Sequence, residues 1–251
     1  MKIRRFSTDL LCGMAALLTA AAWPESAATA PDSAIHPYSA VYQIQYRGKT
    51  VGTMEFSVDY DAADDAYTFT SNSAARGLFR LLSPRPVVER SEFTSDAGKI
   101  TPLRFWYEDG SRQGNENFHI RFDWDNGLAV AETSAERHEF AVPHGTLDRG
   151  TMQVQLMLDV ARTGSLSSYT LADDDGLRTY QYHRDGDVQL ETSLGVLETQ
   201  AFVQQREGSS RQTLLWTASE LHHLPVRIEQ QRNGETRTVF SLQSVEWLDG
   251  D

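Results

Sequence analysis

Apolar and polar residues alternate with a period of two over most of this chain, and that pattern constrains the fold more than any other feature. In YSAVYQIQY (38–46) and VGTMEFSVDY (51–60) the alternation runs on both sides of the turn RGKT, as in a β-hairpin. AYTFTSNSAA (66–75) continues the pattern. Because side chains alternate across a strand, such segments predict a sheet with one apolar face that must be covered.

Further segments along the chain show the same alternation. Turn residues separate them, such as Asp109-Gly110 and Asp125-Asn126-Gly127. We expect roughly a dozen antiparallel strands in sequential hairpins, which curl as they accumulate. The fold prediction is therefore mainly β, a single curved antiparallel sheet or an incomplete β-barrel with one or two inserted helices. The further strands are expected at 87–95, 103–109, 115–124, 128–136, 138–143, 179–186, 187–195, 196–207, 211–218, 224–234 and 236–248.

Two segments depart from the alternation and predict helices. RGLFRLLSP (76–84) is short and reaches a proline, whereas LDRGTMQVQLMLDVARTG (147–164) is longer. In the longer segment Asp148 is a suitable N-cap and Gly164 a suitable C-cap, although Gly150 weakens the first turn. Its apolar residues recur every four positions: Met152, Leu156 and Val160. In an incomplete barrel an inserted helix plugs the open concave face, and either segment suits that role.

The first 30 residues have the order of a secretory signal peptide. Three basic residues precede an apolar run from about Leu10 to Trp23, and small residues follow. The run is shorter than the ~20 residues of a membrane-spanning helix. We expect residues 1–30 to be removed and residues 31–251 to form a single antiparallel β domain in the periplasm, without a transmembrane segment. The one cysteine, Cys12, lies in the removed segment, so the mature chain has no disulfide or thiol chemistry.

The charge balance excludes some partners. The full chain has a net charge of −12, and removal of residues 1–30 leaves 20 basic and 33 acidic residues. Binding to phosphates needs clustered Lys and Arg, so a chain this acidic is repelled by nucleic acid and by anionic membrane surfaces. We expect no nucleic-acid partner, and we expect a monomer.

Motifs for catalysis and metal binding are absent from the sequence. The seven histidines show no H-x-x-x-H spacing, and phosphate-binding glycine loops and G-x-S-x-G do not occur. His222 and His223 are interpreted as turn residues, and if the backbone there is extended they point to opposite sides and cannot bind one metal together. ADDDG (172–176) is interpreted as a solvated acidic turn. We therefore predict no catalytic residue, no metal site and no cofactor.

Carboxylates on predicted strands leave one enzymatic alternative. Paired carboxylates about 5–10 Å apart cleave glycosidic bonds in many β proteins. A glycan-acting hydrolase is accordingly the third of three hypotheses, and we favour a protein that is not an enzyme. The candidate carboxylates are Glu89, Glu92, Glu108 and Asp123.

Arginines surround the short apolar segment 76–84. Arg76, Arg80, Arg85 and Arg90 either form ion pairs with nearby glutamates or make a basic rim at an apolar opening. Such a rim suits an amphiphile with an anionic head group. Trp106, on a predicted strand, is either a core residue or a platform for a ligand. The candidate ligand-binding residues are Arg76, Leu78, Phe79, Leu82, Arg90 and Trp106.

Several segments in series resemble the bacterial exported proteins of domain of unknown function 3108. They extend over about residues 38 to 246 and include SAARGLFRLLSPRPVVERSEF, PHGTLDRGTMQVQLMLDV and LLWTASELHHLPVRIEQ. The resemblance implies an envelope protein with an antiparallel β fold and no established reaction. The last segment, with Trp216, Glu220, Pro225, Arg227 and Glu229, is also similar to the periplasmic lipoprotein carriers, which implies an unclosed barrel plugged by helices.

These observations favour one function and leave two others open. The leading hypothesis is a periplasmic binding or carrier protein for an apolar or amphiphilic envelope molecule, such as a lipid or a lipoprotein-like amphiphile. The second is an assembly or interaction factor that binds another envelope protein. The third is the glycan-acting hydrolase.

Overall fold

The computed structural model describes residues 34–81 and 84–248. The chain divides into Met1–Ala30 and Pro31–Asp251, and every described residue belongs to the second unit. The expected signal peptide and the candidate residue Leu82 therefore lie outside the described residues.

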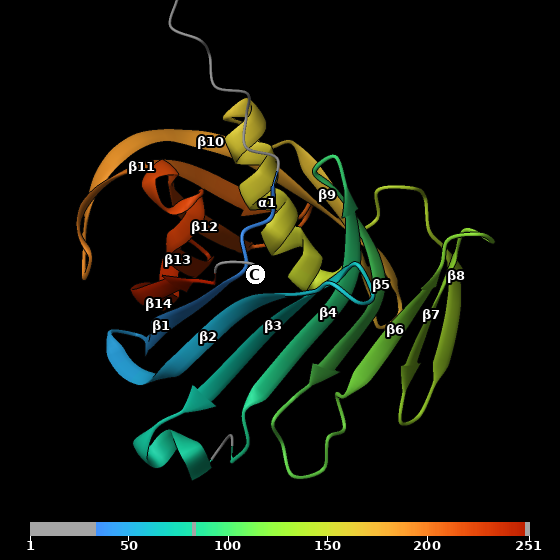
Figure 1. Ribbon diagram of the computed structural model, residues 1–251. Coiled ribbons are helices and arrows are strands. Elements are labelled where there is room, and N and C mark those ends of the chain that lie inside the picture. The colour runs from blue at the N-terminus through green and yellow to red at the C-terminus, as the bar shows by residue number, and fades with distance from the viewer. Residues whose placement is uncertain (1–33, 82–83, 249–251) are drawn as a thin grey trace, which may run out of the picture. The chain divides into compact units, whose positions relative to one another are not determined.

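The described strands form one antiparallel sheet of 14 strands (Figure 1). Their order is β8-β7-β6-β5-β4-β3-β2-β1-β14-β13-β12-β11-β10-β9, so β8 and β9 are the two edges and the sheet is not closed into a barrel. This confirms the predicted fold class. The strands are β1 (Tyr38–Tyr46), β2 (Lys49–Asp61), β3 (Ala66–Ala75), β4 (Val87–Asp96), β5 (Lys99–Glu108), β6 (Phe118–Asp123), β7 (Leu128–Thr133), β8 (Arg137–Ala141), β9 (Ser168–Asp173), β10 (Gly176–Thr192), β11 (Gly195–Gln205), β12 (Arg211–Ala218), β13 (Leu224–Arg232) and β14 (Glu235–Trp247).

Helix α1 (Arg149–Thr163) connects the two edge strands and lies in the concavity of the sheet (Figure 1). It contacts β3, β4 and β5 on one side and β9 on the other. The short segment instead forms a 3-10 helix, η1 (Gly77–Leu81), between β3 and β4 at one end of the sheet. Only the longer helix therefore fills the role of a plug. Phe79 and Leu81 of η1 are exposed.

Two segments differ from the sequence-based expectation. Strand β10 is continuous where two strands were expected, because its pairing with β11 passes through Gly186 with a register shift instead of turning there. Strand β9 was not expected, and it makes Asp173 a strand residue. Asp173 is buried, so the interpretation of 172–176 as a fully solvated acidic turn was wrong.

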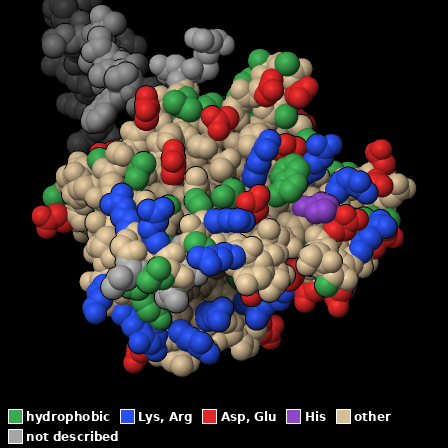
Figure 2. Space-filling model, turned by 90° about the horizontal axis from the view of Figure 1, so that it is seen from below, with side chains coloured by type: hydrophobic (Ala, Val, Ile, Leu, Met, Phe, Trp, Pro, Cys, Tyr) green, Lys and Arg blue, Asp and Glu red, His purple; other side chains and the backbone are tan. Residues whose placement is uncertain are grey.

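The two ends of the sheet differ in charge. Four neighbouring turns, β3–β4, β1–β2, β13–β14 and β11–β12, follow one another along one end because of the strand order. With the strand residues beside them they contain nine basic and two acidic residues, and we call this set the basic rim (46–49, 76–81, 84–86, 206–211 and 232–237). Figure 2 shows Lys and Arg side chains gathered on this end. Turns 61–65, 123–127 and 219–223 at the opposite end contain six acidic residues and no basic one.

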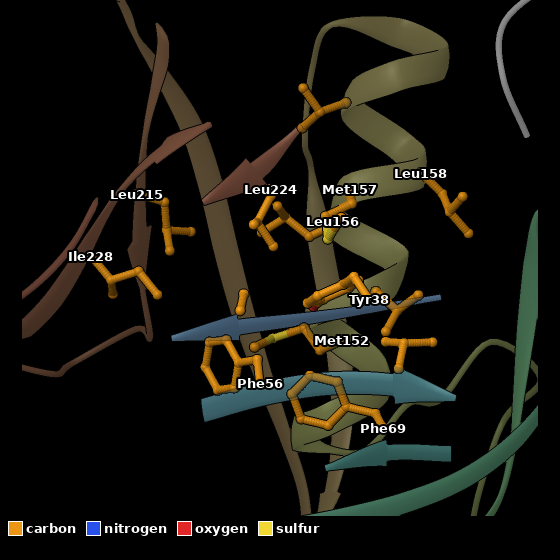
Figure 3. Close-up of a cluster of buried hydrophobic side chains, with 14 of the residues drawn as sticks. Tyr38, Phe56, Phe69, Met152, Leu156, Met157, Leu158, Leu215, Leu224 and Ile228 are labelled. Atoms are coloured by element: carbon orange, nitrogen blue, oxygen red, sulfur yellow. The ribbon is translucent and has the colours of Figure 1, made fainter. Parts of the chain in front are cut away.

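The core lies between α1 and the concave face of the sheet (Figure 3). Nearly all sides of α1 are buried, as expected for a helix inside a sheet rather than on its surface. Leu156, at the centre of the helix, is fully buried. Side chains from both halves of the sheet pack with the helix, so that α1 joins the halves: Tyr38, Phe56, Phe69, Leu215, Leu224 and Ile228.

Candidate functional site: a polar cavity at the basic end

A cavity of about 670 Å³ lies at the same end as the basic rim. Strand ends of β9 to β14, the start of α1 and Glu89 of β4 line it. Six of its 20 lining residues are arginines and six are glutamines, whereas only Met152, Leu171 and Tyr180 are apolar. Such a lining suits a ligand that is anionic and accepts hydrogen bonds, because guanidinium and amide groups are donors. The arginines are Arg149, Arg178, Arg206, Arg211, Arg232 and Arg237.

Two of these arginines face each other across neighbouring strands. Arg211 of β12 and Arg232 of β13 are directly opposite in the antiparallel register. Like charges in opposite positions destabilise a strand pair. In the part of the chain that the structure describes, neither residue forms an ion pair, and neither does Arg206 in the adjacent turn. An anion in the cavity would relieve this repulsion.

Arg149, the first residue of α1, lines the cavity and connects two parts of the sheet that are far apart in the strand order, β4 and the edge strand β9. Its guanidinium binds Asp173 of β9 at 2.7 Å and Glu89 of β4 at 3.4 Å. It also lies over the rings of Tyr107 and Phe118, 5.3 and 5.4 Å from their centroids. Burial raises the pKa of Glu89, although the charge of Arg149 opposes that shift. Asp173 binds a second arginine, Arg178, at 2.6 Å.

Replacing Arg149 by methionine should lower the free energy of unfolding by about 2 kcal/mol. Removing one partner of a buried ion pair costs about 3–5 kcal/mol, and the cost is smaller here because the side chain of Arg149 is 36% exposed. Arg162→Met is the matched control, since Arg162 forms an exposed ion pair with Asp159 on the same helix and such pairs contribute at most about 1 kcal/mol. Urea unfolding measures both. Equal losses in the two variants would contradict the bridging role of Arg149.

Two of the six glutamines in the lining lie beside buried polar or sulfur atoms of the core. The side-chain oxygen of Gln153 is buried and has no hydrogen-bond partner among the described residues. Gln204 donates to the hydroxyl of Tyr182, which in turn donates to the sulfur of Met152 at 3.0 Å. Since buried polar atoms normally have partners, the Gln153 oxygen offers an acceptor for a hydroxyl or amide of a ligand.

The candidate residues from the sequence form two groups. Arg90 and Trp106 are cross-strand neighbours on β4 and β5, with the guanidinium 5.3 Å from the ring centroid, and Arg90 also binds Glu92 at 2.8 Å. They lie on the outer face, because the adjacent Phe105 is in the core. Arg76 and Phe79 lie at η1, as does the backbone of Leu78. The residues that line the cavity include neither Arg76 nor Phe79, Arg90 or Trp106.

The arginines that line the cavity were missed in the sequence, although a local signal exists. Each of two hairpin turns is bracketed by arginines, in REGSSR (206–211) and RNGETR (232–237). A hairpin places its flanking residues at one end of the sheet. Two such turns on successive hairpins therefore predict a cluster of arginines at one end.

The adjacent histidines belong to a connection, as predicted, but their backbone is not extended. They lie between the 3-10 helix η2 (Ser219–Leu221) and β13, and both have left-handed φ values of 48° and 60°. The ring of His222 packs on His36, with centroids 4.0 Å apart, and on Trp247 at 4.6 Å. Burial lowers the pKa of His223. Among the described residues no group of three potential metal ligands occurs.

With the fold and the cavity established, comparison with known families assigns the chain. The model of the family described as protein of unknown function (DUF3108) matches residues 41–240. The chain belongs to the DUF3108 family. This confirms the resemblance seen in the sequence. None of the curated proteins is significantly similar in sequence to this DUF3108 protein.

Solved structures are similar to this DUF3108 protein at low sequence identity. The beta-barrel-like protein of domain of unknown function DUF1849 from Brucella abortus has a TM-score of 0.53 and 11% identity, covering 86% of this chain and 99% of that one. A chain in the complex of Pseudomonas aeruginosa MucA/MucB has a TM-score of 0.40 and 10% identity, over 87% of this chain and 54% of that one. An exported protein with a YmcC-like fold from Bacteroides fragilis has a TM-score of 0.38 and 11% identity, over 84% and 96%.

Within the described part of the chain, no helix has the length and apolar character needed to span a membrane.

Proposed function

We propose that this protein is an exported binding protein that holds an amphiphile by its anionic head group in the polar cavity. The observation that carries the proposal is the opposed pair Arg211 and Arg232, which line the cavity without an ion pair to a described residue. Guanidinium groups bind phosphate or carboxylate oxygens through two parallel hydrogen bonds. A head group between the two strands would neutralise a repulsion that the protein otherwise retains.

The lining favours an amphiphile over a purely apolar molecule. Arginines and glutamines suit a head group, and Met152, Leu171 and Tyr180 provide apolar surface for only the first part of a chain. Helix α1 fills the interior beyond the cavity. A long apolar ligand would therefore not fit entirely inside.

Binding suits the described residues better than glycan hydrolysis does. Two of the carboxylates proposed for that chemistry are engaged in ion pairs, Glu89 with Arg149 and Glu92 with Arg90. The signal-peptide pattern of residues 1–30 supports export. We expect a periplasmic protein without catalytic activity.

The proposal is tested by calorimetric titration with dodecyl phosphate and with the neutral dodecyl maltoside. The protein should bind the phosphate and not the maltoside. The double variant Arg211→Gln/Arg232→Gln should bind dodecyl phosphate at least tenfold more weakly, because each hydrogen bond to a charged group contributes about 1.5–3 kcal/mol. Mass spectrometry of lipid extracted from protein purified without detergent then identifies the natural ligand.

The control is a second pair of opposed arginines. Arg104 of β5 and Arg121 of β6 are also cross-strand partners, and neither lines the cavity. Arg104→Gln/Arg121→Gln removes the same charge and should leave the affinity unchanged. Equal affinity for phosphate and maltoside, or equal weakening by both double variants, would refute the proposal.

A further inference from the structure

The basic rim combines an exposed apolar segment with a cluster of positive charges. Leu81 of η1 is 80% exposed and Phe79 is 36% exposed, beside Arg76, Arg80 and Arg85. Single exposed apolar side chains are common, whereas exposed apolar side chains that lie together and are rimmed by polar residues mark interaction sites.

The rim is a connected surface and not a set of independent loops. The amide of Arg47 in the β1–β2 turn donates to the carbonyl of Arg237 on β14, at 2.8 Å. Asn233 in the β13–β14 turn donates to Ser210 in the β11–β12 turn, at 3.0 Å, and Arg76 donates to Val51 of β2, at 2.7 Å. These bonds hold the turns, and the arginines they carry, at one end of the sheet.

We infer that the basic rim docks on an anionic phospholipid bilayer, with Phe79 and Leu81 inserted at the surface. Lys and Arg near an anionic bilayer are attracted to it, and apolar side chains among them enter the headgroup region. The net charge of the whole chain argued against such a surface. That average conceals the rim, because the acidic turns 61–65, 123–127 and 219–223 lie at the opposite end of the sheet. The acidic β9–β10 turn lies at the same end as the rim, and its three aspartates form ion pairs with Arg178.

Docking in this orientation turns the cavity toward the bilayer, since Arg206, Arg211 and Arg232 belong both to the rim and to the cavity lining. Membrane docking is tested separately from ligand binding, because the described side chains of η1 do not line the cavity. Docking can therefore fail while the cavity binds its ligand, and the reverse also holds.

The test is cosedimentation of the purified protein with vesicles. We expect binding to phosphatidylcholine vesicles that contain about 30% phosphatidylglycerol and little binding to pure phosphatidylcholine. Salt at about 0.5 M should weaken the binding, because exposed charges are then screened. Arg76→Gln/Arg80→Gln should reduce the affinity about 25-fold, since each basic residue near the surface contributes about fivefold. Leu81→Ser should reduce it about tenfold, because an apolar side chain is no longer buried.

Two controls at the opposite end match these variants. Val196→Ser replaces an apolar side chain that is 65% exposed beside the β10–β11 turn. Lys99→Gln removes a basic residue at the start of β5. Neither should change vesicle binding, and Leu81→Ser should keep full affinity for dodecyl phosphate. Equal binding to both kinds of vesicle, or binding insensitive to the η1 variants, would overturn the inference.

Discussion

Replacing Gly150 by valine should lower the free energy of unfolding by more than about 3 kcal/mol, the upper end of ordinary overpacking costs. A Cβ atom at Gly150 would lie 2.2 Å from the Ser91 hydroxyl oxygen and 2.6 Å from the Phe69 ring. Both neighbours are fully buried, so neither can move aside into solvent. Helix α1 would have to withdraw from β3 and β4. The Ser91 hydroxyl would then lose its 2.6 Å hydrogen bond to Asp148.

A loss of stability in Gly150→Val would be due to packing, because helix propensity alone predicts a gain in stability. Replacing a helical glycine by alanine normally stabilises a helix by about 0.5–1 kcal/mol, and replacing it by valine stabilises it less. Arg162→Val is the control, because it places the same β-branched residue at an exposed position of α1 and should cost less than about 1 kcal/mol. Urea unfolding compares the two variants. A Gly150→Val protein as stable as the control would show that the helix does not need this close approach.

Local patterns predicted much of the fold because their causes are local. The period-two alternation marks the inward faces, as on β6, where Phe118, Ile120 and Phe122 are buried and the residues between them are exposed. The helix caps were also predictable. The Asp148 side chain accepts from the amides of Gly150 and Thr151, and Gly164 has a left-handed φ of 64°. Both depend on neighbouring residues only.

Features set by distant residues were not predictable in the same way. A turn at Gly186 is locally reasonable, and only the long pairing of β10 with β11 makes the strand continuous. Gly150 looks like a weak point in a helix until Phe69 and Ser91 are packed against it. Which of two apolar segments fills the sheet is likewise decided by the whole core.

The candidate site shows the same division. The opposition of Arg211 and Arg232 follows from hairpin register and could have been found in the sequence. The position of Arg149 between Glu89 and Asp173 could not, because it requires the two limbs of the open sheet to meet at the first residue of α1. The net charge of the whole chain argued against binding to anionic membranes, because it averages over a basic rim at one end of the sheet and acidic turns at the other.

Asp148 should make the stability of the fold depend on pH with an unusual sign. Its carboxyl is fully buried, and burial raises its pKa from 3.8 to about 6, although Ser91 and the amides of Gly150 and Thr151 oppose that shift. The native state therefore holds a proton that the unfolded chain releases between these two pH values. The stabilisation is fully present below about pH 4 and is lost as the pH rises through about 6. The total is about 3 kcal/mol, since one pKa unit corresponds to about 1.4 kcal/mol.

Asp148→Asn isolates this contribution. Asparagine is an equally good N-cap and carries no titrating proton, so any fixed cost of the substitution is the same at every pH. Urea unfolding at about pH 4 and pH 7 should show the wild type losing stability relative to the variant by about 2–3 kcal/mol. Carboxyls whose hydrogen bonds lower their pKa values, such as those of Asp109 and Asp123, act in the opposite direction. They are present in both proteins and cancel in the difference, so a difference that stays constant with pH would mean that Asp148 is ionised throughout.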